Sequence, residues 1–181
     1  LDALFYLEKN FSPDYACFSS LVLSESKTKD LVFPMPILNH NMHPTLYPFK
    51  RKIYQEAHLP KNLSIYPFAH LFNGALIPTE VVRKIGNINQ DYFIMGDEVD
   101  YFYRLRQNGV VGTLFQAKHF HPDVSMRPYS KVKIYYLLKN SIINHSMYMD
   151  FTFVRNAALV FIVLIRVLRR NGILFFLSLL F

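Results

Sequence analysis

The chain has 181 residues, a formal net charge of +7 and a hydrophobic fraction of 51%, with 17 Phe, 12 Tyr and no Trp. This length suffices for one domain with a buried core, and the basic balance suits negatively charged partners such as nucleic acid, anionic lipid or phosphorylated small molecules. The one cysteine, Cys17, excludes an internal disulfide, so we expect a reducing compartment and a small core residue at this position.

The N-terminal part predicts a helix, a strand and a long irregular segment. Residues 2–10 have apolar positions at helical spacing, and 15–23 (YACFSSLVL) form an apolar run of strand length. Residues 24–67 contain six prolines, and we expect a loop that binds substrate or acts as a lid. The chain starts inside the first predicted helix without Met or signal-peptide features, so we expect a fragment that lacks an upstream portion.

The second half predicts longer and more regular elements. We expect a strand or buried edge at 69–77, in which Gly74 allows a close backbone approach, and Gly86 is expected to close the helix that follows. The further predicted elements are a helix at 79–85, a helix at 97–108, a strand pair or one bent strand at 110–121, helices at 130–150 and 151–170, and an apolar segment at 173–181.

The apolar segment that begins at residue 151 carries arginines at helical spacing. Arg155, Arg166 and Arg170 are predicted to share one face of a helix. Such a helix suits the surface of a membrane with anionic lipid, whereas Arg166 interrupts the roughly 20 apolar residues that a span needs. The alternative is a C-terminal helix that packs on the domain with its arginines in water. We expect 151–181 to be a membrane-associating tail.

Three carboxylates, those of Asp97, Glu98 and Asp100, stand at the start of the helix predicted at 97–108. Asp97 can cap this helix and Asp100 can close a capping box, and acids in a first turn favour the helix dipole. Glu98 is not needed for capping, and a carboxylate held rigidly at a helix start can act as a general base. Spacing alone leaves both interpretations open.

An ordered series of short motifs surrounds these acids. The series consists of Asn73-Gly74, Lys84-Ile85-Gly86, Asp91-Tyr92-Phe93, Asp97-Glu98-Val99-Asp100, Arg104, Gly109 and His121, followed by IYYLLKNS at 134–141. It resembles family 2 glycosyltransferases, particularly the bacterial rhamnosyltransferase- and galactofuranosyltransferase-like members. The resemblance covers most of residues 70–142, and its specificity lies in the order of the motifs, since no single one is diagnostic.

The resemblance implies an α/β fold of the GT-A type. Residues 1–150 would form a partial catalytic domain without the N-terminal nucleotide-binding part. The family's Asp-x-Asp element is absent from the 181 residues, so we expect the chain to be inactive by itself.

The resemblance also assigns the catalytic base. The matching residue is Glu98, and Asp97 is its rival because the family more often has Asp at the matching position. Asp100 and Arg104 match positions that we expect to bind substrate, as do Asn73 and Gly74.

A strand-end histidine of the family helps to hold a divalent metal, Mn or Mg, on the donor diphosphate. The matching residue is His121, with His119 as the fallback. Imidazole suits Mn, whereas Mg prefers oxygen ligands.

The implied reaction is inverting transfer of a sugar from a nucleotide-diphosphate donor to a glycan or polyprenyl-linked glycan, as in cell-surface polysaccharide synthesis. Tyr47, Phe49 and Tyr66 are candidates for an acceptor platform, although core packing is an alternative for each. A basic tail that adheres to membranes fits an enzyme on the cytoplasmic face of the cell membrane, either peripheral or anchored.

Three other functions have less support. A catalytically silent, membrane-associated adaptor would use the acids only as helix caps. Nucleic-acid binding is disfavoured because the arginines of the tail stand among Leu, Ile and Val, away from a polar patch with exposed aromatics. A zinc hydrolase is disfavoured because the sequence has no HExxH motif.

Overall fold

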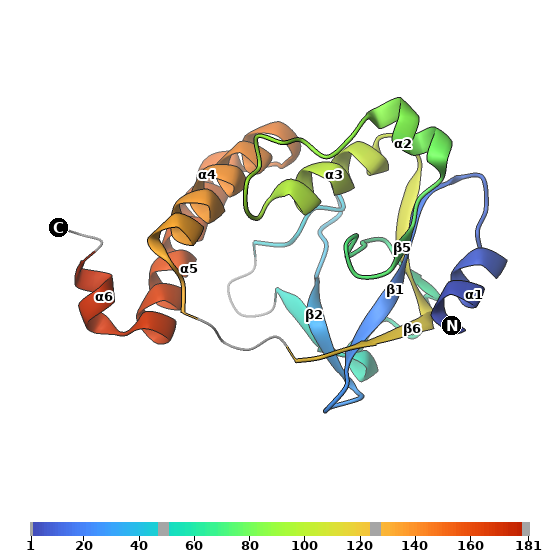
Figure 1. The fold of residues 1–181 in the computed structure, drawn as a ribbon, viewed down its shortest axis with the longest axis horizontal. Coiled ribbons are helices and arrows are strands. Elements are labelled where there is room, and N and C mark those ends of the chain that lie inside the picture. The colour runs from blue at the N-terminus through green and yellow to red at the C-terminus, as the bar shows by residue number, and fades with distance from the viewer. Residues whose placement is uncertain (1, 47–50, 124–127, 179–181) are drawn as a thin grey trace. The chain divides into compact units, whose positions relative to one another are not determined.

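The computed structural model describes residues 2–46, 51–123 and 128–178, and it shows a mixed α/β protein (Figure 1). The chain forms two compact units. The first comprises Leu1–Ile88 and Tyr101–Val124, and the second comprises Asn89–Asp100 and Ser125–Phe181. The domain boundary predicted at residue 150 lies within the second unit, between two of its helices.

The sheet of the first unit is built on two long parallel strands, β1 (Tyr15–Ser24) and β6 (Val110–His121). Nearly every residue of β1 is buried, as expected for a strand that is covered on both faces. Cys17 is fully buried, and burial raises the pKa of its thiol to about 12. The predicted strand at 15–23 and the core position of Cys17 are therefore confirmed, and of the two alternatives predicted for 110–121 the single strand is confirmed.

Four shorter strands complete the sheet, which is mixed: β2 (Asp30–Pro36), β3 (Lys52–Gln55), β4 (Ile65–Tyr66) and β5 (Ala75–Leu76). The order is β3-β2-β1-β6-β4, and β5 also pairs with β1; all these pairs are antiparallel except β1 with β6. The prediction of an irregular segment over 24–67 is therefore wrong, since three strands and the 3-10 helix η1 (Glu56–His58) lie within it.

Three helices belong wholly or partly to the first unit. They are α1 (Asp2–Lys9), α2 (Thr79–Ile85) and α3 (Asp97–Arg106), all of which lie where helices are predicted. Gly86 ends α2 at a positive φ of 77°, which glycine adopts without steric cost. The unit boundary falls within α3, so that its first turn belongs to the second unit and the rest to the first.

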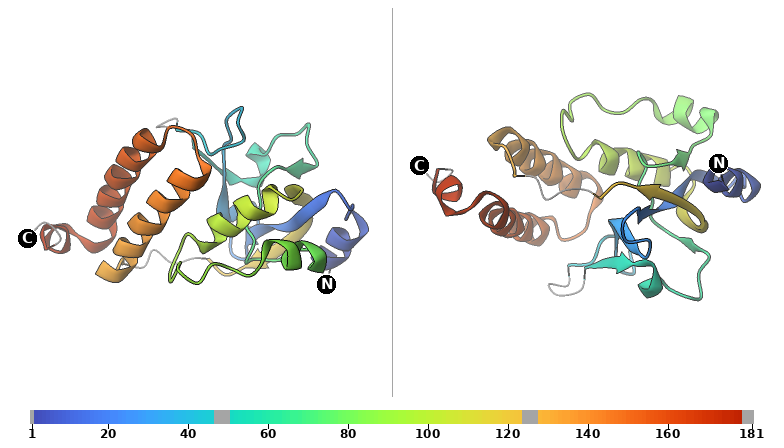
Figure 2. Two further views of the ribbon diagram at one scale, coloured as in Figure 1. Left: turned by 90° about the horizontal axis from the view of Figure 1, so that it is seen from above. Right: turned by 60° about the horizontal axis from the view of Figure 1, so that its bottom comes forward.

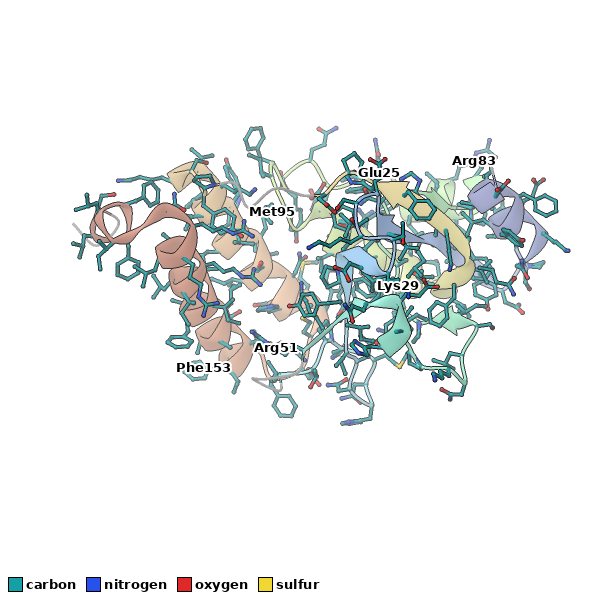
Figure 3. The ribbon with its side chains drawn as sticks, turned by 90° about the horizontal axis from the view of Figure 1, so that it is seen from below. Glu25, Lys29, Arg51, Arg83, Met95 and Phe153 are labelled. Carbon is teal, nitrogen blue, oxygen red and sulfur yellow. The ribbon has the colours of Figure 1, made fainter. Side chains whose placement is uncertain are left out.

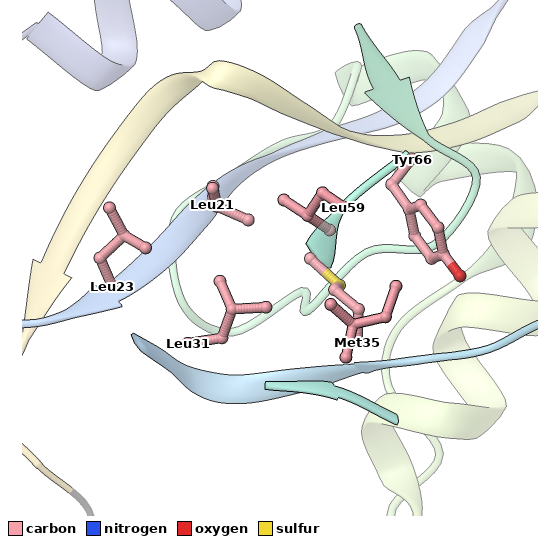
Figure 4. Packing of buried hydrophobic residues seen from close by; sticks show 7 residues of the cluster. Leu21, Leu23, Leu31, Met35, Leu59 and Tyr66 are labelled. Atoms are coloured by element: carbon pink, nitrogen blue, oxygen red, sulfur yellow. The ribbon is translucent and has the colours of Figure 1, made fainter. Parts of the chain in front are cut away.

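The first unit has two hydrophobic clusters. The larger one joins β1 to β2, β3 and β4 and contains Leu21, Leu23, Leu31, Met35, Ile53, Leu59 and Tyr66 (Figure 4). The other packs α1 against the sheet through Leu7, Phe18, Leu114 and Ala117. Apolar side chains of this size each stabilise the fold by about 1.5–3 kcal/mol when fully buried.

The second unit is a helical hairpin with a short third helix. Its helices are α4 (Lys131–Tyr148), α5 (Thr152–Asn171) and α6 (Ile173–Leu177), and α4 and α5 lie side by side in Figure 2. The Ser130 hydroxyl caps α4 by accepting a hydrogen bond from the Lys133 amide. Tyr129, Ile134, Val163 and Val167 form the core between the helices.

The arginine stripe predicted on α5 is only partly exposed. The Arg155 side chain is 5% exposed, and its guanidinium forms an ion pair with Asp150 at 2.5 Å. Arg170 is partly buried and lies over the Tyr129 ring, 4.6 Å from the centroid. The prediction that Arg155 forms part of an exposed basic face is therefore wrong, because the packed face of the helix includes this position.

Within the ranges that the structure describes, no helix is both long enough and apolar enough to cross a membrane.

The ring of His70 lies in the first unit between two phenylalanines, with ring centroids 5.5 Å from Phe33 and 5.1 Å from Phe68. Burial, together with the positive charge of Lys52, lowers the pKa of His70 to about 4. The unfolded chain binds a proton at this residue near pH 6.5, whereas the folded chain resists it. The contribution of neutral His70 to the free energy of unfolding is therefore fully present above about pH 6.5 and is lost as the pH falls towards 4.

We expect this effect to remove about 2 kcal/mol of unfolding free energy by pH 5 and roughly 3 kcal/mol by pH 4. Urea unfolding between about pH 7.5 and about pH 5 measures it. The variant His70→Gln, neutral throughout, should flatten the dependence. The control is His58→Gln, which changes an exposed histidine of the same unit. An equal pH slope in wild type and His70→Gln would contradict the prediction.

Candidate functional site

The acidic residues stand at the beginning of α3. Asp97 is the first residue of the helix, and the side chains of Asp97 and Glu98 are both half-buried. The chain reaches the helix through two residues with positive φ, Met95 at 64° and Gly96 at 93° (Met95 is labelled in Figure 3). The two carboxylates therefore emerge directly from a tight turn, near the positive end of the helix dipole.

Asp100 differs from the other two acids in its surroundings. Its side chain is 2% exposed, and the Tyr148 hydroxyl donates a hydrogen bond of 2.6 Å to Oδ1. Its backbone amide bonds the Gly96 carbonyl at 3.0 Å. That Asp100 contacts substrate remains a prediction. The carboxylate already accepts a hydrogen bond from Tyr148 of α4.

Two asparagines of α4 bind the turn that precedes the acids. Asn140 Nδ2 donates to the carbonyls of Ile94 and Met95, at 3.1 and 2.6 Å. Asn144 Nδ2 donates to the Gly96 carbonyl at 2.9 Å. Both asparagines are buried, so these bonds are shielded from water.

A tyrosine that precedes this turn also forms a hydrogen bond with α4. Tyr92 is buried, and its hydroxyl donates to Asn144 Oδ1 at 2.9 Å. Sequence reasoning did not assign a role to Asn144 or Tyr148, although 140, 144 and 148 recur at intervals of four and so mark one face of the helix. That spacing is the signal that could have found them.

Asn73 and Gly74 lie in the first unit, just before β5. Their carbonyls accept hydrogen bonds from the Ser20 hydroxyl on β1, at 3.3 and 3.2 Å. Gly74 has φ of 88°, and a Cβ at this position would lie 2.7 Å from Ser20 Oγ. The predicted close backbone approach at Gly74 is confirmed, and it gives the residue a structural role beside the predicted contact with substrate.

Arg104 also lies in the first unit. Its Nη1 donates to the carbonyls of Ile85 and Asn87, at 2.9 and 3.0 Å, and so caps the C-terminal end of α2. Its guanidinium also lies over the Tyr101 ring, 4.9 Å from the centroid. That Arg104 binds substrate remains a prediction. In the structure its side chain links α3 to the end of α2.

His121 ends β6 in the first unit. Its Nδ1 lies 2.6 Å from the Pro122 carbonyl, and its ring lies edge-on to Phe33. A carbonyl only accepts, so Nδ1 carries the proton and Nε2 of the neutral ring keeps its lone pair. This is the form of imidazole that binds a metal.

His121 thus fits as one ligand of a divalent ion. In the described part of the chain, no three His, Cys, Asp or Glu side chains are grouped closely enough to hold a metal. The fallback, His119, has its ring centroid 6.4 Å from that of His121.

The candidates for an acceptor platform have separate outcomes. Tyr66 is a core residue, and its hydroxyl donates to the Pro36 carbonyl at 2.6 Å. The other two, Tyr47 and Phe49, lie outside the described residues.

The structure brings together one set of the predicted residues. Asp97, Glu98 and Asp100 lie in the second unit with the α4 side chains that hold them, whereas Asn73, Gly74, Arg104 and His121 belong to the first unit. Comparisons with models of protein families, with curated proteins and with solved structures found no match.

Proposed function

We propose that the chain is the acceptor-side part of an inverting glycosyltransferase of the GT-A type. The observation that carries the proposal is the placement of Asp97 and Glu98 at the start of a helix whose preceding turn is held by buried amides. General-base catalysis needs a carboxylate in a fixed position, and this arrangement supplies one.

The order of the elements also supports the proposal. The short helix α2 is followed by a turn, the acid-bearing helix α3 and the strand β6, which ends in His121. This is the order that the resemblance implies. A resemblance of the fold alone does not establish an activity, so the main support for the proposal is the position of Asp97 and Glu98.

In the proposed reaction, a Glu98 carboxylate oxygen accepts the proton of an acceptor hydroxyl as that hydroxyl attacks the anomeric carbon. Asp97 is the rival base and otherwise stabilises the helix start. Nε2 of His121 is available as one metal ligand, and a divalent ion, Mn or Mg, when bound would stabilise the negative charge of the leaving diphosphate. The donor is a nucleotide sugar, and the acceptor a glycan or a polyprenyl-linked glycan.

The variant Glu98→Gln tests this proposal, because it keeps the side-chain size and removes the base. Turnover should fall by about 10²–10⁴-fold, with folding unchanged. The measurement is metal-dependent nucleotide release from a panel of sugar nucleotides, by the protein at its natural length in membranes with lipid extract as acceptor.

The matched control is Glu80→Gln, which changes an exposed acid in the first turn of α2 and should leave turnover unaltered. Equal turnover in wild type and Glu98→Gln would assign the base to Asp97 or to another residue. Absence of turnover in wild type with every donor would favour the catalytically silent membrane adaptor.

We further propose that the protein works at the cytoplasmic face of the membrane and that α5 and α6 contact the lipid. The exposed face of these helices is apolar and includes Phe153, Phe161 and Leu174, which are 85%, 65% and 82% exposed (Phe153 is labelled in Figure 3). A cluster of exposed apolar side chains of this kind marks an interaction surface. The packed face contains Arg155, so the apolar side, and not the predicted arginine stripe, is the side that would enter the lipid.

The distribution of charge favours anionic lipid as the partner. Residues 125–181 contain eight Lys and Arg but only one acid, Asp150, whereas residues 1–124 contain twelve of each sign. The whole net charge of +7 is therefore carried by the segment that holds α4, α5 and α6. Exposed Arg166 and Arg169 lie on the same helix as the apolar face.

The double variant Phe153→Ser with Phe161→Ser should weaken vesicle binding by about tenfold for each phenylalanine, because each loses its burial in lipid. Sedimentation with vesicles of phosphatidylcholine plus about one third phosphatidylglycerol measures this. Raising the salt from about 0.1 to about 1 M should weaken binding of the wild type as well.

The control is Phe5→Ser with Phe72→Ser, which removes two exposed phenylalanines of the first unit. Equal losses in both double variants, or binding without regard to anionic lipid, would contradict the placement of the membrane surface on α5 and α6.

A further inference from the structure

We infer that Asn140 and Asn144 are positioning residues for the general base, an inference that rests on the proposed function. Their side-chain amides hold three successive carbonyls, those of Ile94, Met95 and Gly96. The next residues in the chain are the two candidate bases. The direction in which those carboxylates leave the backbone is therefore set by bonds that come from α4.

The bonded segment has a backbone conformation that needs external support. Met95 has φ of 64°, and a non-glycine residue in this region costs about 1–2 kcal/mol. Gly96 follows with φ of 93°, so two successive residues turn the chain into α3. Such local strain persists only where surrounding contacts hold it, and here the amides of Asn140 and Asn144 do so.

The turn and α4 are in direct contact. A Cβ at Gly96 would lie 2.7 Å from the Cβ of Asn140 and 3.3 Å from Nδ2 of Asn144. Only glycine therefore allows the backbone to approach the helix this closely. With no space for a side chain between them, a movement of the turn requires the breaking of its hydrogen bonds to α4.

One atom of Asn140 lowers the stability of the fold. The residue is 1% exposed, and its Oδ1 is buried with no hydrogen-bond partner in the part of the chain that the structure describes. A buried acceptor without a partner costs about 1–3 kcal/mol. An apolar side chain would not carry this cost, so the amide is explained by the two carbonyls that its Nδ2 holds.

A hydrogen bond from α4 also reaches the first turn of α3. Tyr148, one further turn along α4 from Asn144, donates to Asp100. The same face of α4 thus bonds the turn before Asp97 and the residue that completes the first turn of α3. Glu98 lies between these fixed points, so its backbone cannot shift while all of the bonds persist.

Loss of the amides should therefore move the base without removing it. Displacement of a catalytic group by about 1 Å can cost about 10²-fold in rate. We expect Asn140→Leu and Asn144→Leu, which replace the amide by an apolar group of similar size, to lower kcat by about 10–100-fold. The KM for the donor should change less than about twofold, because the base acts on the acceptor.

A second measurement does not depend on activity. Hydrogen exchange of the amides of Asp97–Asp100 should be at least about tenfold faster in both variants, since the bond from the Asp100 amide to the Gly96 carbonyl loses its support. Should Asn140→Leu fail to fold, Asn140→Ala removes the same amide without adding a larger apolar group or a charge.

The matched control is Asn171→Leu. Asn171 belongs to the same unit, and its amide bonds the backbone of Tyr129 at 2.8 and 2.9 Å without touching the acidic turn. This variant should lose comparable stability yet keep kcat and the exchange rates of Asp97–Asp100.

Each contrary result overturns a distinct part of the inference. Wild-type exchange rates in both Asn variants would show that the amides do not hold the turn. Faster exchange with an unchanged kcat would show a structural role only. If neither Glu98→Gln nor Asp97→Asn changed turnover, both candidate bases would be removed, and with them the catalytic meaning of the two asparagines, whatever the exchange rates are.

Discussion

The parallel pairing of β1 with β6 is the constraint on which the first unit depends. Parallel strands cannot be joined by a tight turn, and here the connection runs from Glu25 to Gly109. Everything inserted in that connection, including the shorter strands, α2 and α3, has to return to the two long strands. The pairing also explains why β1 is buried almost throughout, because other elements cover both of its faces.

Side chains that donate to backbone carbonyls hold the irregular parts of this connection. Thr113 on β6 donates to the Phe68 carbonyl at 2.6 Å, and Ser20 on β1 donates to the carbonyl of Gly74. Arg104 does the same for the end of α2. The asparagines of α4 follow this pattern in the second unit, with the difference that the segment they hold leads into acids that are candidates for chemistry. A buried loop needs partners for its carbonyls, and side-chain amides supply them.

The long elements could be predicted from the sequence, whereas the short ones could not. The spacing of apolar residues predicts the strand YACFSSLVL and the helix at 130–150. In contrast, β2 contains Pro34 and Pro36, which argued against a strand. β2 pairs with β1 at Leu31, and Pro36 stands opposite Lys52 of β3 as the last residue of the strand, so neither proline interrupts the pairing with β1. Strands of two residues, such as β4 and β5, exist only because a partner strand lies beside them.

Helical spacing likewise showed which residues share a face but not what that face meets. The arginines of α5 were correctly grouped, yet Arg155 packs inward against Asp150. The asparagines of α4 are four residues apart, yet their partners lie 45 and 48 residues away in the sequence, as the pairs Asn140 with Met95 and Asn144 with Gly96 show. The same distance explains why residues 89–100 could not be assigned to the second unit from the sequence, although 125–181 differ from the rest of the chain in charge.

The three acids of α3 are chemically alike but structurally different, and this difference narrows the question of mechanism. Asp100 is buried and accepts a hydrogen bond from Tyr148, so its carboxylate is committed to the junction of α3 with α4. Asp97 and Glu98 precede it on the half-buried first turn, immediately after the turn that the amides fix. A base has to reach a proton on a bound acceptor, which a carboxylate enclosed by its own protein does less readily than one at the surface. Helix capping and the proposed catalysis therefore need not compete for the same side chain: Asp100 secures the first turn, and the proposed base is one of the two acids before it.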